Sequence, residues 1–221
     1  MTSLPETAVR PLEPGERTAA VPVQWGVPWP RGAMRELPDL DLVVGQYARA
    51  IDSWVTARWP DGSVKWSGHA GTALDGESAL VPRGSTAEKA PGLHIEQTEG
   101  GTIAVATDLL RIEVSPGEAP IRRLVVDERE VGVEGRIVAT SSETPHPHSS
   151  RREHTVLITE VSVERAGSVQ AVLRLAGHHE VGGETVLPFV LRLYVTTGSR
   201  RVRAVHSLVW DADPERLFLT S

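Results

Sequence analysis

The chain has 221 residues, enough for one large β domain or two small ones with an ordinary hydrophobic core. Its 23 Lys and Arg against 29 Asp and Glu give a formal charge of −6, which argues against a nucleic-acid-binding surface, and the absence of cysteine excludes disulfides and thiolate metal sites. The N-terminus lacks a secretory signal, and no apolar run approaches the ~20 residues of a membrane-spanning helix. We therefore expect a cytoplasmic protein without a membrane partner.

Residues 1–20 are rich in Pro, Glu and Thr, have no periodicity, and predict a flexible lead-in. From residue 21 onward, short β-rich runs alternate with clusters of Gly, Pro, Asp and Ser, and no stretch sustains the apolar spacing of a helix. A weak helix candidate, Leu42 to Ile51, is interrupted by Gly45. The sequence therefore predicts an all-β protein.

Two tryptophan-rich motifs stand near the start of this β region, a first motif over residues 24–32 and a second motif over residues 57–66. In the second motif, Pro60 presets a turn, Asp61 accepts backbone hydrogen bonds, and Gly62 takes the left-handed position. We expect a hairpin with a three-residue loop and a glycine bulge. The expected pairs are Trp59 with Ser63, Arg58 with Val64, and Thr56 with Trp66.

Cations beside indoles make these motifs a candidate surface for acidic sugars, because flat rings suit sugar C–H faces and cations suit carboxylates. The tentative substrate-binding residues are Trp25, Trp29, Arg58, Trp59 and Lys65. On the expected register, the Lys65 stem lies along the Trp59 indole. We favour the alternative that the rings fill the interior of a small barrel and close its mouth.

A small, polar and aperiodic stretch at residues 83–92 predicts a linker, which places a domain boundary at residues 92 and 93. Beyond it, four runs follow one another at hairpin spacing and predict a meander with one apolar face: 155–163, 168–175, 188–195 and 201–210. Residues 103–114 and 121–131 are expected to supply part of a second layer. Residues 140–153 predict a long loop.

Histidine spacing does not favour a metal site. The residues considered are His146, His148 and His154 in the loop region, with His178 and His179 further on. Neighbouring residues on a strand point to opposite faces, so His178 and His179 are unsuited to share one ion. His206 alternates with apolar residues and predicts a core histidine. We find no catalytic motif and expect no metal or other cofactor.

The segments 25–32 and 58–66 resemble the signature of the N-terminal RIFT-barrel domain of the exo-rhamnogalacturonan lyase (PcRGLX/YetA-like) family. Three later segments are similar to the central β-sandwich domain of that family: 167–179, 187–194 and 202–211. The resemblance implies a RIFT-type β-barrel over 21–92 and an antiparallel, incomplete β-sandwich over 93–221, truncated at its C-terminus. It also implies that polysaccharide cleavage belongs to an α-helical barrel absent from this chain, so no catalytic residue is carried over.

Three functions stay open. The first is a noncatalytic N-terminal portion of a rhamnogalacturonan-lyase-like protein, structural or weakly contacting carbohydrate. Its implied partners are an acidic pectic oligosaccharide and a helical domain encoded separately. The second is a small, complete polysaccharide lyase with its site between the two β domains. The third is a protein-docking module that uses the exposed sheet edge near residues 202–210.

Overall fold

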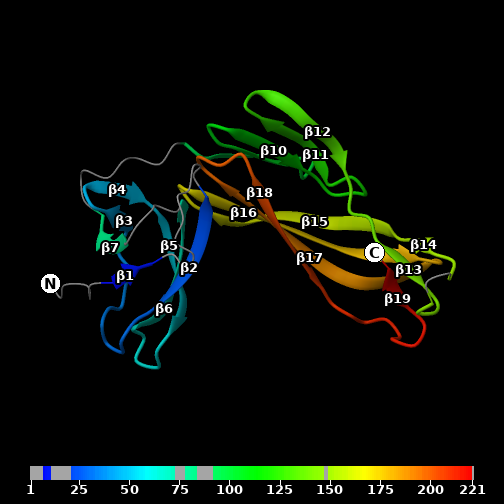
Figure 1. Cartoon of the computed structure of the whole chain (residues 1–221), viewed down its shortest axis with the longest axis horizontal. Coiled ribbons are helices and arrows are strands. Elements are labelled where there is room, and N and C mark those ends of the chain that lie inside the picture. Colours follow the sequence, from blue (N-terminus) through cyan, green and yellow to red (C-terminus); the bar gives the residue numbers. More distant parts are fainter. Residues whose placement is uncertain (1–6, 11–20, 73–77, 84–91, 147–148, 221) are drawn as a thin grey trace. The chain divides into compact units, whose positions relative to one another are not determined.

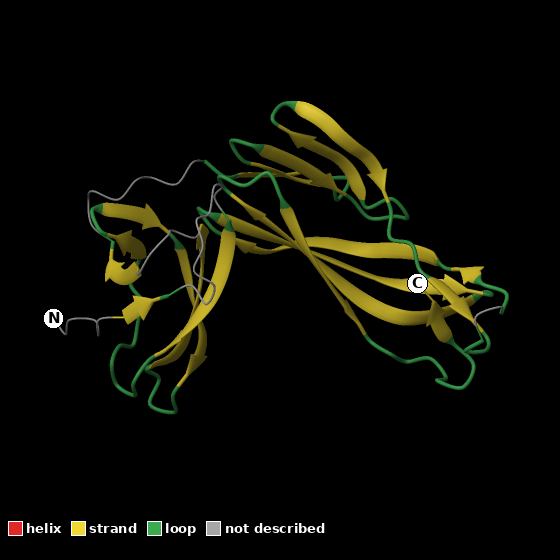
Figure 2. Ribbon diagram, in the orientation of Figure 1, coloured by secondary structure: helices red, strands yellow, loops and turns green. Residues whose placement is uncertain are grey.

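The computed structural model describes residues 7–10, 21–72, 78–83, 92–146 and 149–220. Strands and turns make up this backbone, which contains no helix, and therefore none that could cross a membrane (Figures 1 and 2). The expected all-β class is confirmed. The chain divides into two compact units. The first unit holds residues 1–93 with the turn segments 167–170 and 196–199, and the second holds 94–166, 171–195 and 200–221.

The first unit is built from two antiparallel sheets, neither of which closes on itself (Figure 1). The three-stranded sheet, in spatial order, contains β2 (Pro22–Pro28), β6 (Val64–Thr72) and β5 (Asp52–Arg58). The four-stranded sheet contains β1 (Thr7–Val9), β7 (Ser78–Pro82), β3 (Leu40–Val44) and β4 (Tyr47–Ala50). Their shared core consists of Val27, Trp29, Leu40, Leu42, Ile51, Val64 and Leu80.

Two expectations for this unit are wrong. Within the predicted flexible lead-in, β1 forms a strand, because Val9 packs against the core while the backbone pairs with β7. The rest of that segment lies outside the described residues, as do residues 84–91 of the predicted linker. The weak helix candidate forms the β3–β4 hairpin, with Gly45 at a φ of 56° in its turn, because alternate residues such as Leu42 are needed in the core.

The turn of the second motif has the expected form. Trp59 N donates to Ser63 O at 2.8 Å, and Gly62, with a φ of 82°, donates to Trp59 O at 2.9 Å. Arg58 pairs with Val64 as expected, but Trp66 pairs with Ala57 and not with Thr56. Register shifts on either side of Ala57 cause the difference, since each adds a residue on only one strand.

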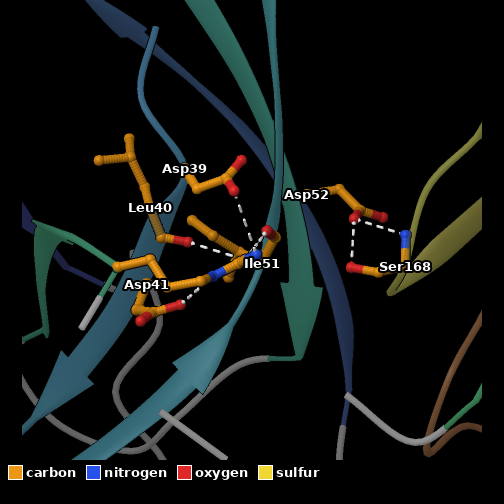
Figure 3. A network of polar contacts seen from close by, with 7 residues as sticks. Asp39, Leu40, Asp41, Ile51, Asp52 and Ser168 are labelled. Carbon is orange, nitrogen blue, oxygen red and sulfur yellow. Dashed lines mark hydrogen bonds and ion pairs between the residues drawn. The ribbon is translucent and has the colours of Figure 1, made fainter. Parts of the chain in front are cut away.

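Two polar networks hold the chain where β4 passes into β5, at the adjacent residues Ile51 and Asp52 (Figure 3). Arg83 Nε donates to Asp41 Oδ1 at 2.9 Å, and its Nη2 donates to the Ile51 carbonyl oxygen at 3.1 Å. Asp41 is only 1% exposed, so this charge is compensated inside the unit. On the next residue after Ile51, the Asp52 carboxylate accepts the amide hydrogens of three consecutive residues, Ser168, Val169 and Gln170, at 2.7–3.0 Å.

The second unit contains the predicted meander, a sheet of β15 (Thr155–Ala166), β16 (Gln170–Val181), β17 (Glu184–Thr196) and β18 (Val202–Leu208). A five-stranded sheet contains β12 (Arg129–Gly135), β11 (Ile121–Val126), β10 (Leu110–Val114), β9 (Ile103–Ala106) and β8 (His94–Gln97). A third sheet contains β14 (Arg152–Glu153), β13 (Thr140–Ser142) and β19 (Phe218–Thr220). The long loop expected at 140–153 therefore begins and ends in short strands.

Burial in this unit follows the alternation of the sequence. The apolar positions expected on one face of β16 and β17 are buried: Ala171, Leu173 and Leu175 on the first, and Leu191, Leu193 and Val195 on the second. β9 and β10 also bury their apolar side chains, whereas Val131 and Val133 of β12 are more than half exposed. The last strand of the meander differs, because every residue of β18 is at least partly exposed.

Candidate functional site

The two tryptophan motifs are bonded to each other, although thirty residues separate them in the chain. Trp29 N donates to the Lys65 carbonyl oxygen at 2.9 Å, and Trp59 Nε1 donates to the Trp29 carbonyl oxygen at 3.1 Å. The Arg31 and Asp61 side chains form an ion pair at 2.9 Å. We call this set of contacts the motif junction. It combines a buried backbone pairing with a charged contact at the surface.

Asp61 organises the turn at the motif junction. Its Oδ1 accepts hydrogen bonds from Ser63 Oγ at 2.6 Å and Ser63 N at 3.0 Å. These two bonds, followed by the bond from Arg31, lower the pKa of Asp61 to about 2, because each stabilises the ionised carboxylate. Ser63 Oγ in turn accepts the amide hydrogen of Gly32 at 2.9 Å. One short side chain thus links the turn to the first motif.

The interior side of the first motif carries a buried polar chain. Trp29 is 3% exposed and donates its Nε1 hydrogen to Ser67 Oγ at 2.7 Å. Ser67 Oγ lies 2.7 Å from His69 Nε2, and Ser53 Oγ lies 2.9 Å from His69 Nδ1. The Trp25 ring stacks on His69 with centroids 5.4 Å apart.

Ser67 and His69 are as close as a catalytic nucleophile and its base, but their surroundings do not suit catalysis. Both residues are 0% exposed, and burial lowers the pKa of His69 to about 4. The imidazole is therefore neutral and bonded on both nitrogens, and the serine hydroxyl already accepts the Trp29 hydrogen. No substrate reaches this hydroxyl, so the arrangement is suited to a structural role.

The structure brings together only some of the tentative sugar-binding residues. Lys65 Nζ lies over the Trp59 ring, 4.7 Å from its centroid, so the lysine and the indole are neighbours as expected. Arg58 belongs to the same hairpin, and its Nη1 donates to the carbonyl oxygens of Arg35 and Gly62 at 2.6 and 2.9 Å. Trp25 packs instead on the interior histidine, and Trp29 is buried. Sugar binding by this set stays a prediction.

A second pair of indoles, on the other face of the three-stranded sheet, was not singled out from the sequence. Trp66 is 41% exposed, and the Trp54 ring lies so close over Gly68 that a Cβ there would be 2.5 Å from its Cε2. Gly26 pairs directly with Gly68. The sequence did contain a signal for this packing. Gly26 and Gly68 lie in the interior of two strands, and a glycine at such a position marks the close approach of a neighbouring group.

The second unit contains a group of rings that sequence spacing also missed. The His179 ring contacts the rings of His154, Phe189 and His206, and Phe189 also contacts His206, with centroids 4.7–6.2 Å apart. The three histidines come from the β14–β15 connection and from β16 and β18, so only strand pairing assembles them. His178 points away from this group and pairs with Glu180 at 3.2 Å. Across the described part of the chain, no group of three or more metal-ligating side chains is arranged to hold an ion, and His148 lies outside that part.

A cavity of about 210 Å³ lies beside the third sheet of the second unit. Its lining consists of Ser142, Pro145, His146, Ser149, Arg151, Phe218, Leu219 and Thr220. It is smaller than the ~300 Å³ at which small-molecule sites usually begin. We do not assign a ligand to it.

Comparison with known proteins agrees with the division of the chain. Residues 5–84 match the model described as the PcRGLX-like N-terminal RIFT barrel domain, and residues 93–221 match the PcRGLX-like protein central beta sandwich domain. The chain is 30% identical over 199 residues to the uncharacterized protein YetA of Bacillus subtilis (strain 168). The matched region covers 86% of this chain and 23% of that relative.

Proposed function

Because the chain belongs to the PcRGLX-like family, with an N-terminal RIFT barrel domain and a central β-sandwich domain, we propose that it is a noncatalytic, structural portion of a rhamnogalacturonan-lyase-like protein. In this proposal, cleavage of the polysaccharide belongs to a separate α-helical domain. The two β domains support that domain and make at most weak contact with an acidic pectic oligosaccharide.

The motif junction is the observation that supports a structural role. Trp29 is buried and uses its side-chain hydrogen on Ser67, while Trp59 uses its own on the Trp29 backbone. Lys65 occupies one side of the Trp59 ring. The groups that looked available to a ligand in the sequence are thus largely engaged within the unit.

A lyase assay tests the noncatalytic part of the proposal. Incubation of the chain with rhamnogalacturonan is expected to produce no unsaturated uronate, measured as absorbance of the double bond conjugated with the carboxylate. A rhamnogalacturonan lyase serves as the positive control and the heat-unfolded chain as the blank. Absorbance that grows with enzyme concentration would overturn the proposal and support the alternative of a small, complete lyase.

Fluorescence titration tests weak carbohydrate contact separately. The exposed side of the Trp59–Lys65 pair is expected to respond to galacturonate-containing oligosaccharides only at millimolar concentration, because one stacked ring and one cation bury little area. Lys65→Ala should abolish the response, and Trp210→Phe, in the second unit, should leave it unchanged. Emission that stays constant at millimolar ligand would restrict the motifs to their structural role.

A second candidate function, docking of another β-strand, is favoured by the exposure of β18. This strand is at one edge of its sheet, and Leu208, Val209 and Trp210 are 36%, 59% and 45% exposed. An unpaired edge with apolar side chains is a template for pairing. Sedimentation at increasing concentration should show association that Leu208→Lys weakens and Val131→Lys, on the edge strand β12, does not. Equal association of both variants would contradict docking through β18.

A further inference from the structure

We call His154, His179 and His206 the histidine cluster; His154 and His179 share one unusual property, whereas His206 is exposed. His179 is 2% exposed, and neither of its ring nitrogens has a hydrogen-bond partner. His154 is 3% exposed, with Nε2 2.8 Å from Ser141 Oγ and Nδ1 without a partner. Buried polar atoms are normally bonded, so three unbonded ring nitrogens at one place require an explanation.

The histidine cluster packs as a set of aromatic rings. The His179 centroid lies 5.4 Å from that of His154 and 5.1 Å from that of Phe189, and the Phe189 centroid lies 4.7 Å from that of His206. Neutral imidazole is compatible with such contacts between ring edges and faces. A charged imidazolium would need two acceptors, and the two nitrogens of His179 have none.

Among the residues that the structure describes, no carboxylate is placed to stabilise a charge on His179. On the neighbouring strand β15 its paired residue is Val156, and from β17 it meets Phe189. Burial, followed by the positive forms of His154, His206 and His178, lowers the pKa of His179 to about 4. Glu180 is next along β16 but faces the other side, where it pairs with His178.

The other charged groups described near the histidine cluster do not supply a counter-ion to its rings either. Glu153 and Arg152 of β14 are exposed, and Ser141 of β13 is neutral. Asp211, which follows β18, accepts the amide hydrogen of Leu187 at 2.7 Å. Protonation of His154 and His179 would therefore bring two positive charges together in a buried position where the described residues supply no counter-ion.

We propose that the histidine cluster is an acid-sensitive lock of the second unit. Contacts of the neutral His179 ring with His154, Phe189 and His206 hold the β14–β15 connection, β16, β17 and β18 together. Protonation separates the rings and opens this end of the four-stranded sheet. The opening exposes the inner side of β17 and frees the already exposed strand β18.

The expected pH window follows from the sign of the shift. The pKa of His179 lies near 4 in the folded state and near 6.5 in an unfolded or opened state, so the opened state binds more protons between these values. The closed form of the four-stranded sheet is therefore favoured most above pH 6.5, and its advantage over the opened form decreases as the pH falls toward 4. By pH 4.5 the opening equilibrium should rise on the order of 10²-fold.

Hydrogen exchange of the β16 and β18 amides tests the proposal in the unmodified chain and in His179→Phe. Protection factors, corrected for intrinsic exchange, should fall on the order of 10²-fold between pH 7 and 4.5 in the unmodified chain. His179→Phe removes the buried titrating ring but keeps a ring next to Phe189, and should lose most of that fall. His178→Gln is the matched control, since it removes a neighbouring imidazole from the opposite face and should retain the fall.

Three results would overturn the lock, and the first two are as follows. One is a protection loss in His179→Phe equal to that of the unmodified chain. The other needs no variant and decides the matter even if His179→Phe does not fold: imidazole NMR of the unmodified chain that shows His179 protonating above pH 6 in the closed state. Constant protection of both strands from pH 7 to 4.5 would have the same meaning.

Discussion

At the scale of single residues, close contact decides which positions tolerate change. Gly26 and Gly68 are paired across β2 and β6, yet their surroundings differ. A Cβ at Gly68 would lie 2.5 Å from Trp54 Cε2, whereas a Cβ at Gly26 would meet Trp66 ring atoms at 3.7 Å. The same residue type is thus required at one position and replaceable at the other.

Gly68→Ala is expected to destabilise the first unit by about 1–3 kcal/mol, because Trp54 must leave its rotamer or the strands must separate. Gly26→Ala is the matched control, since 3.7 Å is an ordinary van der Waals distance, and should change stability by less than about 0.5 kcal/mol. Urea unfolding followed by tryptophan fluorescence measures both. Equal midpoints for the two variants would contradict the packing of Trp54 on Gly68.

At the scale of elements, a single carboxylate holds a turn of the chain. Asp52 accepts amide hydrogens from Ser168, Val169 and Gln170, and it also accepts the hydroxyl hydrogen of Ser168 Oγ at 3.0 Å. Figure 3 shows the two bonds from Ser168. A Cβ at Gly167 would lie within 2.0 Å of Asp52 Oδ2. The turn 167–170 is therefore shaped around the carboxylate, in the manner of a backbone anion-binding nest.

Asp52→Ala is expected to cost about 2–4 kcal/mol, since it leaves three backbone donors without their charged acceptor. Amide exchange of residues 168–170 should increase most. Asp39→Ala is the control from the same region: its side chain is 84% exposed and lies 3.7 Å from Arg83 Nη1, so its loss should change stability by less than about 1 kcal/mol. A larger effect of Asp39→Ala would argue against the anchoring role of Asp52.

At the scale of the whole molecule, each unit buries a histidine that must stay neutral. In the first unit, His69 has a pKa of about 4 because of burial, below the ordinary 6.5. As the pH falls, His69 takes up its proton in the unfolded chain before it does so in the folded chain. The stabilising contribution of the neutral, buried ring is therefore complete above pH 6.5 and is lost as the pH falls toward 4. The ionised Asp61 carboxylate contributes to stability over a lower pH range. Because its pKa is about 2 in the folded state, this contribution is lost as the pH falls from 4 to 2.

The first unit should therefore lose stability between pH 6.5 and 4.5, by about 2–3 kcal/mol from His69 alone. Urea titrations at each pH, followed by the tryptophans of this unit, measure the loss. His69→Gln keeps hydrogen-bonding atoms for the two serines without a titrating ring and should flatten the profile. His94→Gln, which changes an exposed residue on β8 of the second unit, should not. A profile as steep in His69→Gln as in the unmodified chain would contradict this origin of the pH dependence.

Local chemistry determined much of the fold from the sequence alone. Alternating apolar residues and Gly, Pro and Asp clusters were enough to predict an all-β chain and the four-stranded meander. The pairing of Trp59 with Ser63 followed from Pro60, Asp61 and Gly62. The tryptophan motifs indicated the family, which the comparisons confirmed. These features depend on neighbours in the chain, so a short window of sequence contains their causes.

Only the tertiary structure decided what these residues contact. The bond from Trp59 to the Trp29 backbone, the turn shaped around Asp52, and the rings around Phe189 join residues far apart in the chain. The sequence predicted a core residue at His206, which is wrong, because His206 is exposed on the edge strand β18; strand pairing places its ring beside those of His179 and Phe189. Strand periodicity shows which residues share a face, but pairing and packing between distant strands determine which faces meet.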